Sequence, residues 1–304
     1  MDRPPSVTHR CVALAVVLVA SQACTPLPHP VDGLDDDVVQ LVGVWDSDLY
    51  CVLRRGGDSG CFHMVGPDQG RYVPLPLEPG ERVVDLALDA WKACAVLEGG
   101  RARCWEVPMV GPLEFLDGTD VEAGVFAMEV WGDERCVLAT SGQGRCTSGL
   151  EVEGAVDLNA SCLLSDSGDV HCPEGVVSIG AGMISLARRG ACGTRADGTL
   201  VCWEFDGAGL RIEEPAPPTL DARRQAHAHP TGSGGCVVDE AGRVGCWGEP
   251  RTYVSRLDDQ PGMMIDLDAP AQSFVDTRYA SCALFEGGAV RCWPAPDQPS
   301  FGGG

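Results

Sequence analysis

The sequence is poor in lysine, in aromatic residues and in long apolar runs. Lys92 is the only lysine among 22 basic residues, so amine-directed chemistry has a single side chain available. Only four tyrosines and seven phenylalanines accompany 39 glycines and 22 prolines, which favours short strands and turns over long helices. The apolar run at residues 11–20 is too short to cross a bilayer as a helix.

Positive charge and catalytic motifs are scarce as well. The 44 acidic residues outnumber the 22 basic ones, and the net charge of −22 repels phosphate backbones, so we expect no nucleic-acid partner. The sequence has no P-loop, no dinucleotide fingerprint and no Ser-His-Asp order. We therefore expect no cofactor and identify no catalytic constellation.

The N-terminus has the features of an export signal. Basic residues precede the apolar run at 11–20, and small residues at Ser21 and Ala23 precede Cys24, which predicts a signal peptide over residues 1–23. Residues 21–24 resemble a bacterial lipobox, with Ser21 where leucine is usual, and imply lipidation of Cys24. Soluble export and a retained membrane anchor are the alternatives. The Pro- and Asp-rich residues 24–37 are typical of a solvated tether.

Fourteen cysteines form an internal repeat. They fall into seven pairs, and nine residues separate the members of every pair. The pairs are Cys51 and Cys61, Cys94 and Cys104, Cys136 and Cys146, Cys162 and Cys172, Cys192 and Cys202, Cys236 and Cys246, and Cys282 and Cys292. Successive first cysteines are 43, 42, 26, 30, 44 and 46 residues apart, so two units in the middle are shortened.

A glycine lies six residues after each first cysteine and predicts a β-hairpin. In the fifth unit, a three-residue loop closed by Gly198 would place Cys192 directly opposite Cys202. Opposed residues at a non-hydrogen-bonded site lie close enough for a disulfide. Residues two positions inside the cysteines are mostly apolar, so we expect the cysteine face of each hairpin to be the buried one.

Other interpretations of the cysteines are weaker. Zinc knuckles use shorter spacings, so we expect no metal site. Disulfide-linked helical hairpins also use nine intervening residues, but a glycine inside every segment disfavours a helix. An export signal favours oxidised thiols, and hence seven disulfides within the repeats.

The repeats predict an all-β protein, a seven-bladed β-propeller of antiparallel blades over residues 38–304. An apolar stretch precedes most first cysteines, and units of this length with a strand and a hairpin are typical of propeller blades. The sixth unit lacks a clean apolar stretch, at residues 223–226. Blades three and four are shortened, and we expect about three strands in each. Residues 38–44 are expected to complete the last blade and close the ring.

The repeat resembles that of the regulator-of-chromosome-condensation family. Its signature is matched by Cys282, Ala283, Leu284, Gly288 and Trp293 in the seventh unit, and similarly in the sixth. Thr147 and Pro173 depart from it, because tryptophan is expected there. The resemblance spans about residues 38–294 and implies a seven-bladed propeller. It transfers no activity, since the nuclear members act on a small GTPase and on chromatin.

We expect a monomeric binding scaffold that is lipid-anchored in the cell envelope, facing the periplasm or the outside, or else is secreted. Its partner would be a protein or a glycan, bound by loops on one propeller face. Trp45, Trp91 and Trp131 are candidate binding aromatics, although core packing is also a common fate for tryptophan. The alternatives are a polymer-acting lyase or hydrolase and a purely structural envelope protein.

Three polar groupings were considered as sites and are expected to be solvated segments instead. His227 and His229 lack a third metal ligand. Asp258, Asp259, Asp266 and Asp268 lack EF-hand spacing. Asp35, Asp36 and Asp37 belong to the expected tether.

Overall fold

A computed structural model of the chain describes residues 29–31, 34, 36–44, 47–64, 71–108, 113–159, 161–178, 183–187, 191–206, 209–213, 225–228, 234–248, 263–265, 267–277 and 279–294. The predicted signal peptide and Cys24 lie outside these residues, as do Trp45, His229, Asp258, Asp259 and Asp266. Within the described part, no helix is long and apolar enough to cross a membrane.

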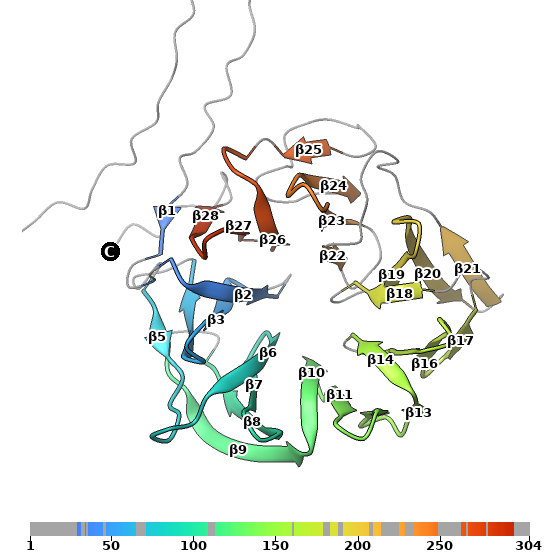
Figure 1. The fold of residues 1–304 in the computed structure, drawn as a ribbon, viewed down its shortest axis with the longest axis horizontal. Helices are drawn as coiled ribbons and strands as arrows, with labels where there is room; N and C mark the ends of the chain where they lie inside the picture. Colours follow the sequence, from blue (N-terminus) through green and yellow to red (C-terminus); the bar gives the residue numbers. More distant parts are fainter. Residues whose placement is uncertain are drawn as a thin grey trace, which may run out of the picture.

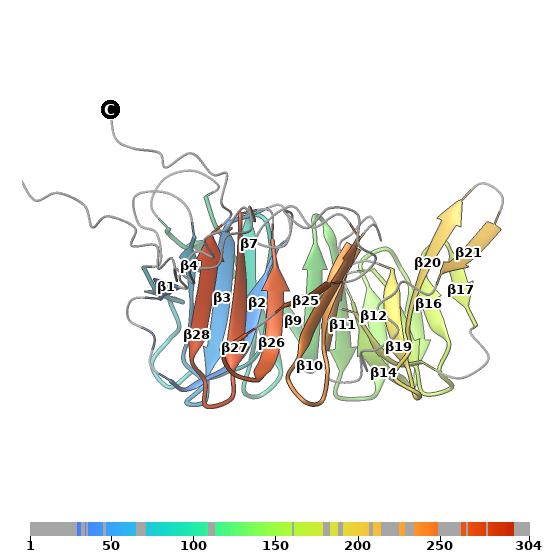
Figure 2. The same ribbon diagram turned by 90° about the horizontal axis from the view of Figure 1, so that it is seen from above.

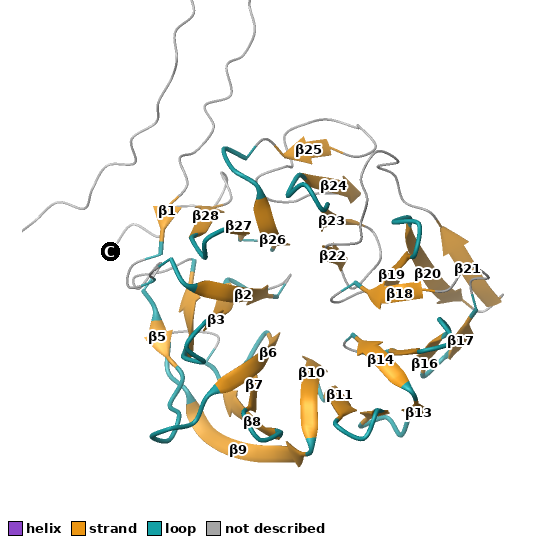
Figure 3. Cartoon of the chain, viewed as in Figure 1, coloured by secondary structure: helices purple, strands orange, loops and turns teal. Residues whose placement is uncertain are grey.

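Seven four-stranded antiparallel sheets form one ring, which confirms the predicted all-β, seven-bladed propeller (Figures 1 and 3). Each sheet is a blade, numbered here in chain order. Blades 1 to 4 contain β2(Val38–Gly43), β3(Leu49–Arg54), β4(Ser59–His63), β5(Val73–Pro74); β6(Val83–Asp89), β7(Lys92–Leu97), β8(Arg101–Glu106), β9(Leu116–Ala123); β10(Val125–Trp131), β11(Glu134–Ala139), β12(Gln143–Cys146), β13(Glu151–Glu153); β14(Ala155–Leu158), β15(Leu163–Ser165), β16(Val170–Cys172), β17(Gly175–Val177).

Blades 5 to 7 follow the same plan. They contain β18(Met183–Leu186), β19(Cys192–Arg195), β20(Leu200–Asp206), β21(Gly209–Glu213); β22(Gln225–Ala228), β23(Gly234–Val238), β24(Val244–Gly248), β25(Met263–Ile265); β26(Ala271–Asp276), β27(Ala280–Phe285), β28(Val290–Pro294) and β1(His29–Pro30). The sixth blade therefore has an inner strand, β22, although its sequence carries no clean apolar stretch.

Blades 3 and 4 are shortened in strand length and not in strand number. The expectation of about three strands was wrong, because both blades have four. The short intervals are accommodated by outer strands β13 and β17 of three residues each, joined to the preceding strand by tight turns.

An N-terminal strand closes the ring, but it is not the one expected. β1 pairs with β28 at the outer edge of blade 7, with His29 opposite Cys292, whereas β2 is the inner strand of blade 1 (Figure 1). The segment expected to be a tether thus supplies a strand. Asp37, also in that segment, accepts a hydrogen bond from Arg54 Nε at 2.7 Å.

A buried tyrosine joins the first and last blades. The Tyr50 hydroxyl lies 2.8 Å from Thr277 Oγ1 and donates to the Ala280 carbonyl at 2.5 Å. Its ring stacks on Phe62. Burial raises the pKa of Tyr50 well above its usual value, so this closing contact is made by a neutral phenol.

All seven hairpins carry the disulfide that the repeat predicts. The two cysteines of every pair are bonded to each other, with Cα atoms 3.9–4.3 Å apart. The bonds join Cys51 to Cys61, Cys94 to Cys104, Cys136 to Cys146, Cys162 to Cys172, Cys192 to Cys202, Cys236 to Cys246, and Cys282 to Cys292. None of these fourteen cysteines is therefore left as a thiol that could bind a metal.

The turn of each hairpin has the predicted form as well. The seven turn glycines adopt positive φ, a backbone conformation that residues with a Cβ rarely take. In each turn the glycine N–H donates to the carbonyl three residues earlier, as from Gly198 to Arg195 at 2.9 Å. The turn thereby sets the register that brings the two cysteines together.

The expectation that only the cysteine face is buried was incomplete. On the other face Val52, Ala95, Leu163 and Ala283 are also fully buried. The blades stand face to face around the ring, so the cysteine face of one blade packs against the opposite face of the next. Both faces of the inner strands therefore belong to the core.

Candidate binding site on the loop face

The propeller has two faces of different character. Strands run from one face to the other (Figure 2). The seven glycine turns between the second and third strands lie on one face, which we call the turn face. Because the strands are antiparallel, the turns between the first and second strands lie on the opposite face, which we call the loop face.

Two of the three predicted binding aromatics occupy neighbouring turns of the loop face. Trp91 lies in the β6–β7 turn and is 44% exposed, and Trp131 is the half-buried last residue of β10. The two turns are joined, because Gly132 N–H donates to Asp89 Oδ2 at 2.8 Å and Lys92 Nζ donates to the Gly132 carbonyl at 3.2 Å. Their role in binding remains a prediction, and Trp45 lies outside the described residues.

The aromatic residue that follows the second cysteine has a repeated place in the core. It lies on the face opposite its own disulfide and packs against the disulfide of the preceding blade. Five junctions between blades contain such a ring, from Phe62, Trp105, Trp203, Trp247 and Trp293. The rings account for much of the apolar burial at these junctions.

The last two disulfides illustrate this packing. Trp293 of blade 7 belongs to the same buried cluster as Cys236 and Cys246 of blade 6. Phe62 of blade 1 belongs to the cluster that contains Cys282 and Cys292 of blade 7, where the ring of blades closes. Cys246 is 3% exposed and Cys292 is fully buried, so both covered disulfides are sealed from solvent.

Two junctions have no such ring, because Thr147 and Pro173 occupy the position and both are exposed. The cluster between blades 2 and 3 is built from Cys94, Val96, Met128 and similar residues. The cluster between blades 3 and 4 likewise has no aromatic member. Cys104 is the one disulfide cysteine of the fourteen that is only partly buried.

A pocket of about 270 Å³ lies between blades 2 and 3, where the ring is missing; we call it the junction pocket. The Cys94–Cys104 disulfide, Val121 and Val130 provide its apolar part. Polar residues of the loop-face turns surround them. The lining is completed by Lys92, Trp105, Glu106, Thr119, Gly132, Asp133, Glu134 and Arg135. Trp91 and Trp131 are chain neighbours of these lining residues.

The charged groups of the junction pocket are partly engaged. Lys92 Nζ lies 3.6 Å from Asp133 Oδ1, whose side chain is fully exposed. Arg135 pairs with Thr147 along the strands, and its Nε is buried with no hydrogen-bond partner among the described residues. Two basic residues, Lys92 and Arg135, thus lie beside the apolar floor together with the acidic residues Glu106, Asp133 and Glu134.

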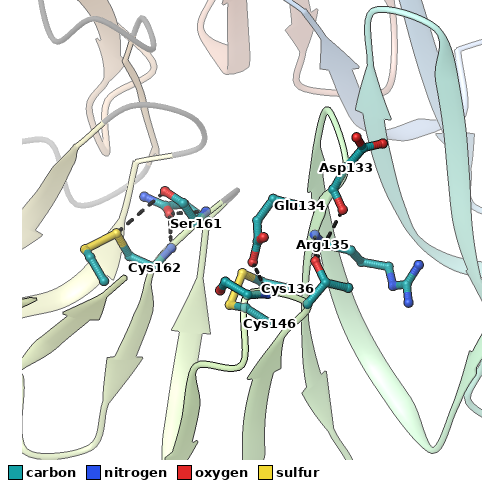
Figure 4. The surroundings of a disulfide bond; sticks show 11 residues. Asp133, Glu134, Arg135, Cys136, Cys146, Ser161 and Cys162 are labelled. Carbon is teal, nitrogen blue, oxygen red and sulfur yellow. Dashed lines mark hydrogen bonds between the residues drawn. A yellow bond between two sulfur atoms is a disulfide. The ribbon is translucent and has the colours of Figure 1, made fainter. Parts of the chain in front are cut away.

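At the next junction a carboxylate lies beside the disulfide (Figure 4). The Glu134 carboxylate points toward the Cys136–Cys146 disulfide and accepts a hydrogen bond from the Ser148 N–H at 3.0 Å, while Arg135 extends away from it. Glu134 and both sulfurs lie within 4.8 Å of one another. A disulfide has no thiolate to offer a metal, so this described cluster is not a metal site.

The described groups with displaced pKa values serve structural contacts. The hydrogen bond from Arg103 Nε at 2.7 Å lowers the pKa of Asp120. A hydrogen bond from Ser178 lowers that of Asp169, and one from the Thr199 backbone lowers that of Asp197. Burial raises the pKa of Tyr72 to about 12. None of these described groups forms a cluster of the kind that general acid–base chemistry uses.

The other polar candidates do not converge in the described part of the chain. His227 lies in β22 opposite Cys236. Asp268 forms an ion pair with Arg291 at 2.6 Å. Neither observation adds a ligand to the groupings considered from the sequence.

Sequence reasoning missed two features. One is the junction pocket. The sequence signal for it was the absence of the repeated aromatic residue, which is missing at Thr147 and at Pro173. The other is a β-bulge in the inner strands, which exposes an apolar residue toward the turn face in four consecutive blades. These residues are Val39, Val84, Phe126 and Val156.

Comparisons with solved structures agree on the fold. Human WBSCR16 is 10% identical, with 92% of this chain and 94% of that chain covered and a TM-score of 0.62. Yeast RCC1 (Prp20), solved with Kap60 bound, is 12% identical, with 86% and 81% covered and a TM-score of 0.59. YCF48 bound to D1 peptide is 8% identical, with 92% and 98% covered and a TM-score of 0.52.

No protein-family model matches the sequence, and neither does any curated protein. The chain has the β-propeller fold, which RCC1 (Prp20) shares and which the repeat resemblance implied. At these identities the similarity extends to the fold alone.

Proposed function

We propose that this protein is an exported, lipid-anchored interaction scaffold that binds a protein partner through its loop face. The observation that carries the proposal is the junction pocket beside Trp91 and Trp131. Tryptophan is enriched among the residues that contribute most to binding at protein interfaces, and Trp91 and Trp131 are chain neighbours of residues that line this partly apolar pocket. Two proteins of similar fold were solved with a partner, RCC1 (Prp20) with Kap60 and YCF48 with D1 peptide.

The proposed location rests on the N-terminal signal and on the disulfides. Seven disulfides are typical of proteins that fold in an oxidising compartment outside the cytosol. Cys24 follows small residues at the end of the apolar run, where lipoprotein processing would make it the first mature residue. A multiply acylated cysteine would hold the propeller stably at a membrane surface.

Fractionation tests the anchor. Cys24→Ala should move the protein from the membrane fraction to the soluble fraction, because the acyl chains would be lost. Cys11→Ala is the matched control, since Cys11 would be discarded with the signal peptide, and it should leave the distribution unchanged. A Cys24→Ala protein that stays membrane-bound and uncleaved would contradict lipidation.

Capture from native envelope fractions tests the scaffold. The wild-type chain should retain a partner that Trp91→Ala and Trp131→Ala lose, because both variants remove apolar contact area from the loop face. Phe126→Ala is the matched control, since Phe126 is 48% exposed on the turn face. Equal capture by all four proteins would contradict binding through the loop face.

A further inference from the structure

We propose that the junction pocket binds an aromatic side chain of a protein partner, which supplies the ring that Thr147 does not provide at the junction of blades 2 and 3. The inference rests on the proposed function, because it names what the partner inserts. The partner would insert a tryptophan, phenylalanine or tyrosine side chain, whose ring packs on the Cys94–Cys104 disulfide.

The internal repeat indicates which group the junction pocket lacks. At five junctions the ring of one blade covers the disulfide of the preceding blade. At the blade 2–3 junction the position belongs to Thr147, which pairs with Arg135 on the side that faces blade 2. The junction pocket is lined by Arg135 and by both cysteines of that disulfide, so it lies on the side where the ring would be.

The junction pocket is large enough to hold an aromatic ring. The junction pocket measures about 270 Å³. An apolar cavity of about 150 Å³ is enough to hold a benzene ring. The pocket therefore has room for an indole ring together with part of the backbone that carries it.

The chemistry of the pocket lining also suits an aromatic ring. A disulfide floor and the side chains of Val121 and Val130 offer apolar and sulfur contacts, and sulfur contacts favour aromatic partners over aliphatic ones. Among the charged lining residues, which also include three carboxylates, Lys92 and Arg135 supply cations for a ring face and donors for a neighbouring carbonyl. A peptide residue combines a ring with such a carbonyl, which a free hydrocarbon does not.

The binding test uses the full mature protein with its disulfides intact and three small probes in saturation-transfer NMR. N-acetyl-tryptophanamide should bind, and N-acetyl-leucinamide should bind at least about tenfold more weakly. N-acetylglucosamine should not compete. Leucinamide binding as tightly as tryptophanamide, or preferential binding of the sugar, would overturn the proposal, and the second result would indicate a glycan site instead.

A self-filling variant locates the probe. Thr147→Trp restores the repeated ring, and it should weaken tryptophanamide binding by about tenfold or more. Thr147→Ala removes the same hydroxyl contacts to the 133–135 turn without adding a ring, and it should change the affinity by less than about twofold. Undiminished binding to folded Thr147→Trp would overturn the proposal.

Two further variants keep the test decisive. Val121→Trp fills the pocket from the blade 2 side and substitutes for Thr147→Trp if that protein does not fold. Pro173→Trp adds a ring at the junction of blades 3 and 4 and should leave tryptophanamide binding unchanged. If Pro173→Trp lost tryptophanamide binding while Val121→Trp retained it, the indole of the probe would bind outside the junction pocket, and the proposal would be overturned.

These results are independent of the capture experiment. Tryptophanamide binding that Thr147→Trp blocks would support the pocket even if no envelope partner were retained. A partner that Trp91→Ala loses but folded Thr147→Trp retains would support the loop-face scaffold and overturn ring insertion.

Discussion

Two neighbouring junctions, between blades 1 and 2 and between blades 2 and 3, are built from equivalent elements but are packed differently. Each has a hairpin disulfide on one side and the inner strands of the next blade on the other. In the first, Trp105 covers the Cys51–Cys61 disulfide and is 2% exposed. In the second, Thr147 replaces the ring, Cys104 is partly exposed, and the junction pocket is present.

The difference separates two roles that the repeat combines. The disulfide and the glycine turn define each hairpin, and they are present in all seven blades. The ring covers the disulfide of the preceding blade at five junctions, whereas aliphatic side chains bury the Cys136–Cys146 disulfide at the junction of blades 3 and 4 without one. A junction can therefore lack the ring, as that of blades 2 and 3 does, while its hairpins keep their disulfides and turns.

The largest expected effect comes from removing a covering ring. Trp105→Ala should lower the free energy of unfolding by about 3–5 kcal/mol, because it opens a cavity in a buried cluster. Thr147→Ala at the equivalent position should cost about 1 kcal/mol or less, since it loses only exposed hydrogen bonds. Urea unfolding of both variants measures the difference, and equal losses would show that the ring does not seal the covered junction.

The next effect concerns the disulfides. Each closes a loop of about eleven residues and should contribute about 2–3 kcal/mol, so reduction should lower the melting temperature strongly. Cys94–Cys104 should be reduced first, because Cys104 is partly exposed, and the covered Cys282–Cys292 bond should be among the last. Mass spectrometry of alkylated peptides during timed reduction measures the order. Earlier reduction of Cys282–Cys292 would contradict the contrast between covered and uncovered junctions.

A smaller contrast separates two turn glycines. Gly142→Ala in blade 3 meets open space, so it should cost only the positive-φ strain of about 1–2 kcal/mol. Gly288→Ala in blade 7 would bring a Cβ within 2.7 Å of Val38 N and 2.8 Å of the Asp36 carbonyl, where the chain enters β2. It should cost at least about 1 kcal/mol more, because backbone must move. Thermal unfolding compares the two, and equal values would count against a tightly closed ring.

The smallest effect is electrostatic. Arg103 lowers the pKa of Asp120, so this ion pair stabilises the fold above the ordinary carboxyl pKa of about 4 and loses that effect as pH falls toward the lower folded value. Asp120→Asn should lower the melting temperature slightly at pH 7 and by less near pH 3. Asp133→Asn is the control, since that carboxylate is fully exposed. A difference that grew on acidification would contradict the assigned direction.

Much of the fold could be predicted because the repeat is local. Cys192 and Cys202 lie ten positions apart around a turn that Gly198 closes, so their pairing follows from one hairpin register. Seven copies of that hairpin then indicate seven blades. The strand count of blades 3 and 4 was harder, since length alone does not reveal that a three-residue strand such as β13 suffices.

Other features depend on partners far away in the chain. β22 forms in a polar stretch because β23 pairs with it, and β1 is a strand only because β28 offers it an edge. The candidate tryptophans show the same limit. Sequence spacing placed Trp91 and Trp131 before their cysteines, but only the ring of blades put them on adjacent turns next to one pocket.

The sequence by itself determined the hairpins, their seven disulfides and the number of blades, because each of these depends on residues within about ten positions of one another. Tertiary structure alone decided which strand closes the ring of blades and that both faces of each blade are buried. It also decided that a pocket lies where Thr147 replaces the repeated aromatic residue. Those features depend on contacts between blades, where a residue faces a neighbour from a different repeat. From the sequence, Thr147 is only a departure from the repeat. The pocket beside it becomes visible only when the neighbouring blade is in place.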